Sequence, residues 1–149
     1  MELFETINSE IKKAMLAKDK VRLEALRGIK KEFLEAKTAK GAADVLSEQT
    51  AISILQKMVK QRKDSTQIYT SQGRDDLAEN ETAQVMVIQE FLPAQLSVEE
   101  VQNHVKKIIT DLGATSMKDM GKVMATATKQ LAGQAEGSVI SQIVRKLLT

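Results

Sequence analysis

Apolar residues recur every three or four positions along almost the whole chain, and this spacing constrains the fold more than any other feature. In the segment LFETINSEIKKAML, the side chains of Leu3, Ile7, Ile11 and Ala14 fall on one face of a helix, because each residue advances the helix by about 100°. No segment shows the sustained alternation of apolar and polar residues that is typical of a half-buried strand. The chain is therefore predicted to be all-α.

The composition agrees with this prediction. One Pro and seven Gly in 149 residues are too few for a chain rich in β turns. Aromatic residues make up only 3% of the sequence and hydrophobic residues 42%. The core is therefore expected to consist of aliphatic side chains and Met.

Pro93 is the only proline and the best candidate for a boundary between two domains. We expect a larger N-terminal domain of about four helices in residues 1–92 and a small three-helix C-terminal domain in residues 93–149. Capping and turn residues predict where these helices begin and end. Helices are expected to begin near Asp19, Ser47, Ser97 and Ser116 and to end near Gly73, Gly113 and Gly133, with a loop around Gly41.

The residue inventory excludes several kinds of active site. The sequence has no Cys, which removes thiolate metal sites and a cysteine nucleophile, and His104 is its only histidine. His104 is expected to be half-buried at the edge of an apolar stripe, or else to act alone as an acid or base. The stretch MGKVM lacks the upstream glycine and the following Ser or Thr of a phosphate-binding loop. No catalytic residue, metal ligand or cofactor is predicted.

The charge balance gives little guidance about partners. With 22 basic and 20 acidic residues the net charge is +2, which is too small to attract nucleic acid or a membrane over a long range. The start MELFETINSE is not that of a signal peptide, and no apolar run is long enough to span a bilayer. The expectation is a cytoplasmic protein without a membrane partner.

One charged residue interrupts the apolar side of the third predicted helix. The residues projecting onto that side are Ala51, Leu55, Met58, Arg62 and Tyr69. A guanidinium there needs a partner, since an unpaired buried charge costs roughly several kcal/mol. A hairpin at Gly73 brings Glu81 level with Arg62, and Asp76 is the substitute partner. Two readings stay open: an ion pair that fixes the hairpin register, or an Arg held for a partner's carboxylate or phosphate.

A second candidate site is a row of lysines on the sixth predicted helix. Lys118, Lys122 and Lys129 lie within about 40° of one another on a helical projection, and Arg145 and Lys146 on the last helix could widen the patch. Such a row suits contact with phosphates, although an exposed face opposite a core stripe looks the same. That stripe consists of Met120, Met124, Ala127 and Leu131. With so few aromatics to stack on bases, contact with the shape and backbone of a folded RNA is favoured.

Three glycines surround this row. Gly121 falls inside the sixth helix, where glycine is unfavourable by about 1 kcal/mol, so we expect a neighbouring helix or a partner's backbone to approach it closely. Gly133 and Gly137 are expected to act as hinges that fold the last helix back onto the sixth.

Several stretches of the sequence resemble the YqeY family. They are QRKDSTQIYTSQGRDDLAENE, EFLPAQLSVEE, GATSMKDMGKVM and GQAEGSVISQIVRKLL. The resemblance covers nearly the whole chain, and its motifs occur in order. It implies an all-α fold with a small C-terminal domain similar to the tail of GatB, a subunit of the tRNA-dependent amidotransferase. That tail is associated with recognition of the tRNA body, so the resemblance implies binding more strongly than chemistry.

The first functional hypothesis is thus a non-catalytic module that binds tRNA or another RNA. Its expected partner is tRNA or a tRNA-charging or amidotransferase complex, with no small-molecule cofactor. One alternative is a protein-interaction adaptor that docks on a translation-related enzyme. Another is an accessory role in amide transfer with glutamine as the amido donor.

Overall fold

The computed structural model describes residues 3–39 and 46–149, and within these ranges every regular element is helical. The prediction of an all-α fold is confirmed. The loop expected around Gly41 lies outside the described residues. The elements are α1 (Leu3–Ala17), α2 (Lys20–Thr38), α3 (Glu48–Ser71), α4 (Asp75–Gln89), α5 (Val98–Leu112), the short 3₁₀ helix η1 (Met117–Asp119), α6 (Met120–Gln130) and α7 (Gly137–Leu148).

Polar side chains cap three of the helices at the predicted positions. The side chains of Asp19, Ser47 and Ser97 each accept a hydrogen bond at 3.1 Å from the backbone N–H three residues later. Each bond satisfies one of the donors that the first turn of a helix leaves without an internal partner. At the other ends, α3 and α5 finish in left-handed glycines, Gly73 and Gly113, with the paired backbone bonds of a Schellman motif.

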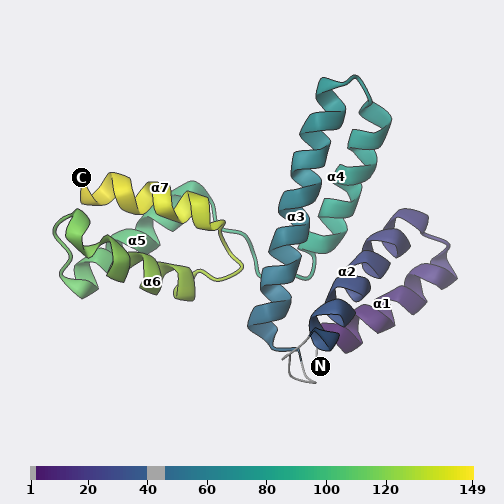
Figure 1. Ribbon diagram of the computed structural model, residues 1–149, viewed down its shortest axis with the longest axis horizontal. Coiled ribbons are helices and arrows are strands. Elements are labelled where there is room, and N and C mark those ends of the chain that lie inside the picture. The colour runs from purple at the N-terminus through teal and green to yellow at the C-terminus, as the bar shows by residue number, and fades with distance from the viewer. Residues whose placement is uncertain (1–2, 40–45) are drawn as a thin grey trace. The chain divides into compact units, whose positions relative to one another are not determined.

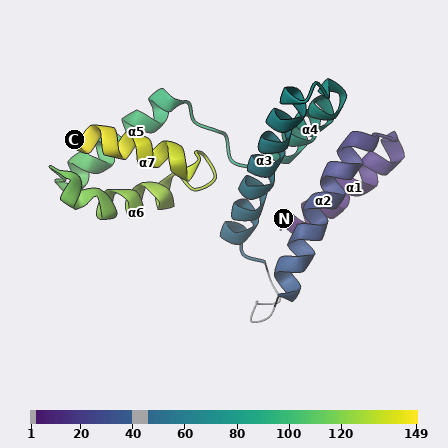
Figure 2. The same cartoon turned by 45° about the horizontal axis from the view of Figure 1, so that its top comes forward.

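The described chain divides into two compact units, Met1–Leu92 and Pro93–Thr149. The N-terminal unit consists of two helical hairpins. One is formed by α1 and α2 and the other by α3 and α4, and the two helices of each hairpin lie side by side (Figures 1 and 2). Helix α2 packs along α4, whereas α2 and α3 meet over only a few residues. That these units are two separate domains, 1–92 and 93–149, stays a prediction.

Aliphatic side chains from all four helices form the core of the N-terminal unit. The largest of them have no exposed surface, and burying each such side chain contributes roughly 1.5–3 kcal/mol. Leu26, Ile29 and the aromatic Phe33 of α2 are among these fully buried side chains. The buried cluster consists of Ile7, Ala14, Leu26, Ile29, Phe33, Ala51, Leu55, Met58, Val59, Val85 and Ile88.

Arg22 ties three helices of this unit together. Its guanidinium donates to Glu10 of α1 at 3.0 Å and to Glu90 at the end of α4 at 2.5 Å. The hydrogen bond from Arg22, helped by one from Lys13, lowers the pKa of Glu10 below its ordinary value. The bond to Glu90 is the main reason that the pKa of Arg22 is raised.

The C-terminal unit is a three-helix cluster of α5, α6 and α7. Its first residues are held to the turn before α7, because Leu96 N–H donates to the Gln134 carbonyl at 2.9 Å and Gln95 Nε2 donates to the Gly133 carbonyl at 2.6 Å. Its buried core consists of Val101, Val105, Ile108, Val123, Ala127, Leu131, Ile140, Ile143, Val144 and Leu148.

The sixth helix differs from its predicted span. The segment from Met117 to Asp119 is a 3₁₀ turn, and α6 begins only at Met120 and ends at Gln130. Local hydrogen bonds explain the tighter first turn: Thr115 N–H donates to the Asp119 carboxylate at 2.9 Å, and Lys118 N–H donates to the Ser116 hydroxyl at 3.4 Å. Such side-chain bonds to the backbone compete with regular α-helical bonding.

Arg22→Gln is expected to lower the free energy of unfolding by about 1 kcal/mol at neutral pH, because it removes two partly exposed ion pairs. The folded chain binds a proton at Glu10 less readily than the unfolded chain, so this contribution is complete above the ordinary Glu pKa of about 4.3. It is lost as pH falls through the lowered pKa of folded Glu10.

Urea denaturation of both proteins at pH 7 and at several values below pH 4.5 measures this effect, and added salt should shrink the difference at pH 7. Arg27→Gln is the matched control, since Arg27 is exposed on the same helix and pairs with no carboxylate among residues 3–39 and 46–149. A gap between wild type and Arg22→Gln that stays constant down to pH 2 would contradict the assignment.

Candidate functional site

The net positive charge of the chain falls on the C-terminal unit. Residues 93–149 contain seven Lys or Arg and five Asp or Glu, while residues 1–92 are balanced, so the entire net charge of +2 falls on this unit. All five predicted phosphate-contacting residues are exposed: Lys118 in η1, Lys122 and Lys129 in α6, and Arg145 and Lys146 in the last turn of α7.

None of these five side chains has a partner among residues 3–39 and 46–149. All six ion pairs that occur within residues 3–39 and 46–149 lie in the N-terminal unit. The arginines Arg22, Arg62 and Arg74 of that unit are each bound to a carboxylate. The charged ends of the C-terminal unit are therefore available to an external anion, because no carboxylate competes for them.

The structure brings four of the five cations to one end of the unit. Helices α6 and α7 form a hairpin in which the last turn of α7 lies beside the start of α6 (Figure 1). Arg145 and Lys146 are therefore at the same end as Lys122 and the preceding η1, which carries Lys118. Lys129 belongs to the last turn of α6, at the opposite end.

The predicted single row of three lysines is thus interrupted. Lys118 is separated from α6 by the change from 3₁₀ to α geometry, so only Lys122 and Lys129 share one helical face. The face opposite them is buried, as expected: Ala127 and Leu131 of the predicted stripe are almost without exposed surface, while Met120 and Met124 are only partly buried. The buried face also includes Val123, which the prediction left out.

Only one of the three glycines has a conformation that a hinge requires. Gly133 is buried with φ +79°, in the left-handed region that favours glycine, and it starts the turn between α6 and α7. Gly137 is simply the first residue of α7. Gly121 lies within α6, and a side chain there would meet no described atom within 4 Å, so the expected close approach of a neighbouring helix is wrong.

Gly121→Ala should raise the free energy of unfolding by about 0.5–1 kcal/mol, since alanine favours the helix and the added methyl has open space. Gly133→Ala should lower it by about 1 kcal/mol or more, because φ +79° is strained for alanine. Thermal and urea denaturation measure both. Equal effects of the two substitutions would contradict this assignment.

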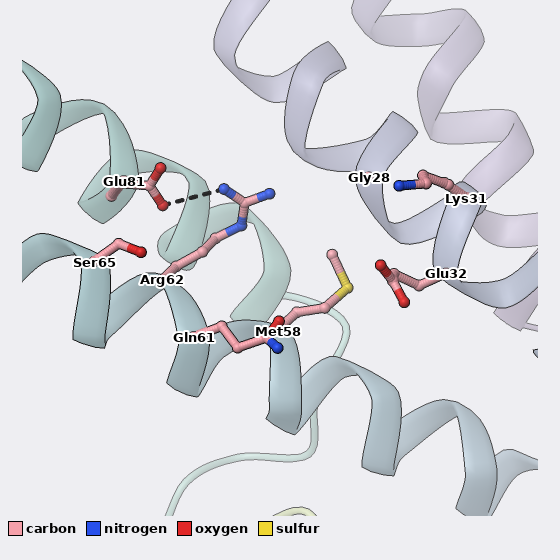
Figure 3. Close-up of a pocket in the computed structure, with 8 residues that line it drawn as sticks. All are labelled: Gly28, Lys31, Glu32, Met58, Gln61, Arg62, Ser65 and Glu81. Atoms are coloured by element: carbon pink, nitrogen blue, oxygen red, sulfur yellow. Dashed lines mark hydrogen bonds and ion pairs between the residues drawn. The ribbon is translucent and has the colours of Figure 1, made fainter. Parts of the chain in front are cut away.

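Arg62 lies between α3, α4 and α2, and it contacts one of its two predicted partners. Its Nη1 donates to Glu81 Oε2 at 3.2 Å, as Figure 3 shows, and the side chains are 23% and 20% exposed. Asp76 instead pairs with Arg74 at 3.3 Å, and this hydrogen bond lowers the pKa of Asp76. Tyr69 is half-buried, and its carbonyl accepts the Arg74 N–H at the end of α3. The structure therefore brings Arg62 and Glu81 together and leaves Asp76 and Tyr69 out.

Sequence analysis did not identify the pocket beside this ion pair. A cavity of about 320 Å³ opens where α2 and α3 diverge, and it is lined in part by Gly28, Lys31, Glu32, Met58, Arg62 and Glu81. Gly28 forms part of the wall with bare backbone: an added Cβ would lie 3.5 Å from Arg62 Nη2 and 3.6 Å from the methyl carbon of Met58. The pocket exists because α2 and α3 diverge, and no sequence pattern in α2 predicts this divergence. The site therefore could not be predicted from the sequence.

Glu81→Gln is expected to lower the free energy of unfolding by roughly 1 kcal/mol, since it leaves a half-buried guanidinium without its carboxylate. Glu79→Gln on the same helix is the control, because Glu79 is exposed and has no ion-pair partner in the described chain. Urea denaturation at neutral pH compares them. If both variants match the wild type, the ion pair does not stabilise the hairpin.

His104 is exposed rather than half-buried. No three His, Cys, Asp or Glu side chains are placed to hold a metal ion among the residues that the structure describes. No described helix is both long enough and apolar enough to cross a membrane.

Comparison with known proteins identifies the family. The family model described as "Yqey-like protein" matches residues 4–148, which is nearly the full chain. This chain belongs to the Yqey-like protein family. The resemblance inferred from the sequence motifs is therefore confirmed at the level of the family.

Curated relatives of the chain carry the name "Altered inheritance of mitochondria protein 41, mitochondrial". The protein of Vanderwaltozyma polyspora is 32% identical over 151 residues, which cover 94% of this chain and 79% of the relative. That of Lachancea thermotolerans is 28% identical over 151 residues, covering 96% and 80%. That of Clavispora lusitaniae is 29% identical over 150 residues, covering 97% and 86%.

These names contradict the predicted cytoplasmic location. The relatives are named as mitochondrial proteins. The prediction rested on composition and on the lack of a recognisable secretion signal. Neither property distinguishes the cytoplasm from the interior of a mitochondrion.

Proposed function

We propose that the protein is a non-catalytic module that binds folded RNA of the tRNA class through the cationic end of its C-terminal unit. Lys118, Lys122, Arg145 and Lys146 form that surface, which we call the cationic end. The single observation that supports the proposal is a contrast in pairing: three of the four arginines of the N-terminal unit are bound to carboxylates, whereas none of these four side chains has a partner in the described chain.

The geometry of the cationic end suits phosphates better than bases. Its side chains come from three separate segments, η1, α6 and α7, so their charges are spread over a surface instead of along one helix. A folded RNA presents phosphates from several strands on one surface. The aromatic side chains needed to stack on unpaired bases are scarce, since the whole chain has only three Phe, one Tyr and no Trp.

Membership of the Yqey-like family is compatible with this proposal. The similarity of that family to the tail of the amidotransferase subunit, noted from the sequence, makes tRNA the first RNA to test. The adaptor role and the accessory role in amide transfer with glutamine as donor stay alternative predictions.

Filter binding of unmodified tRNA at two salt concentrations tests the proposal. Each protein–phosphate contact should contribute a slope of about −0.7 to −0.9 to the plot of log affinity against log salt concentration. Lys122→Gln and Arg145→Gln should each weaken binding at low salt and make the slope shallower by about 1 if each residue contacts one phosphate.

Lys60→Gln is the matched control, because Lys60 is an exposed lysine of α3 in the N-terminal unit with no ion-pair partner within the described ranges. It should leave both affinity and slope unchanged. Binding that is absent at low salt, or that Lys60→Gln weakens as much as Lys122→Gln does, would refute the proposed surface.

A further inference from the structure

The pocket between α2 and α3 holds charged groups that the proposed RNA-binding function does not use. It belongs to the N-terminal unit, where α4 contributes Glu81 behind Arg62. In Figure 3 the Arg62 guanidinium extends from α3 and the Lys31 ammonium from α2, on opposite sides of the pocket, with Met58 and the Glu32 carboxylate below them. Its volume of about 320 Å³ is at the lower end of the range for small-molecule sites.

Arg62 has hydrogen-bonding capacity left over in this pocket. A guanidinium carries five N–H donors, and the only bond that Arg62 forms through its side chain to a described residue is the one to Glu81. Its Nη2 lies next to the bare backbone of Gly28, on the pocket side. Across the pocket, Lys31 reaches Glu35 only at 3.8 Å and is largely exposed, so its ammonium can turn toward a ligand. Two cationic groups from different helices thus line the pocket, and together they suit a carboxylate.

Glu32 supplies the opposite charge. It lines the pocket one residue after Lys31, is half-buried, and has no ion pair or side-chain hydrogen bond to any described residue. A half-buried carboxylate without a partner is a favourable site for an ammonium group. The lining therefore contains two cations and two carboxylates, so a ligand of zero net charge with separated poles matches it better than a simple anion or cation.

A second, adjoining pocket of about 450 Å³ enlarges the site. It shares Glu32, Met58 and Gln61 with the first, and it adds the apolar side chains of Ala36 and Ile54 together with the charged Glu35 and Lys57. Ile54 packs against the core of the unit, and Met58 is almost fully buried. Met58 and Ile54 thus give this part of the lining an apolar surface, and Met58 is flexible enough to adapt to a bound side chain.

We propose that this pair of pockets binds a free α-amino acid with an aliphatic side chain. The α-carboxylate lies between Arg62 and Lys31, the α-ammonium contacts Glu32, and the side chain lies against Met58 and Ile54. No covalent step is involved.

The test uses the full-length protein and L-leucine as the probe, with two analogues that each lack one charged group. The analogues are 4-methylpentanoate, which lacks the ammonium, and 3-methylbutylamine, which lacks the carboxylate. In ¹H–¹⁵N NMR titrations, L-leucine should give saturable shifts of α2 and α3 amides with a dissociation constant near or below about 1 mM. Each analogue should bind at least about tenfold more weakly.

Two substitutions separate the two charged contacts. Glu32→Gln should weaken L-leucine about tenfold or more and leave 4-methylpentanoate unchanged, since only the ammonium contact is removed. Lys31→Gln should weaken L-leucine and 4-methylpentanoate but leave 3-methylbutylamine unchanged. Lys31 is preferred to Arg62 because its substitution preserves the Arg62–Glu81 ion pair. Glu24→Gln and Arg27→Gln, both exposed on α2 and outside the pocket lining, are the matched controls and should change nothing.

Three outcomes would overturn the proposal. The first is the absence of saturable shifts with L-leucine up to about 20 mM, well above the expected dissociation constant. The second is binding of 4-methylpentanoate as tight as that of L-leucine, which would make the pocket a simple anion site. The third is an unchanged L-leucine affinity in Glu32→Gln. These results are independent of RNA binding, which involves the other unit.

Discussion

Burial of aliphatic side chains in two separate clusters is the constraint on which the rest of the structure depends. The cluster of the N-terminal unit draws on α1 to α4 and that of the C-terminal unit on α5 to α7, and they have no residue in common. A chain with so few aromatic residues must bury many small aliphatic ones to offset the conformational entropy of folding. Every charged residue discussed above is consequently confined to helix faces and ends that these clusters leave exposed or half-exposed.

The two units use their charges differently. In the N-terminal unit, Arg22 joins α2 to α1 and to the end of α4, and Arg62 joins α3 to α4, so charge helps to position helices both within and between the two hairpins. In the C-terminal unit, hydrogen bonds around Ser97, Ser116 and Asp119 define the helix ends, and the charged side chains of the lysines take no part in them. Among the described residues, these unpaired cations stabilise no helix end and no helix contact. The functional proposal rests on them for that reason.

Local sequence signals predicted the fold class and much of the helix framework. The caps at Ser47 and Ser97 and the helix ends at Gly73 and Gly113 involve bonds between residues a few positions apart, which a sequence reveals directly. The contact of Arg62 with Glu81 followed from the hairpin register that Gly73 sets. Both the cap bonds and this contact depend on short-range geometry.

The remaining features depend on relations that a single sequence does not contain. The 3₁₀ turn before α6 results from competition between two weak side-chain bonds and one helical turn. The open space around Gly121 and the pocket between α2 and α3 depend on how far one helix lies from another. The mitochondrial names of the relatives concern targeting, which the packing of residues 3–148 does not determine.

Gly28 gives the N-terminal unit a means of changing its selectivity without changing its charges. A methyl group at this position would make ordinary van der Waals contact with Arg62 and Met58. A single substitution of Gly28 by alanine would therefore narrow the cavity without a change in any other helix. Alanine also favours the helical conformation more than glycine does, so Gly28→Ala would stabilise α2 as well as narrow the pocket. The residue at position 28 thus affects both the size of the pocket and the stability of α2.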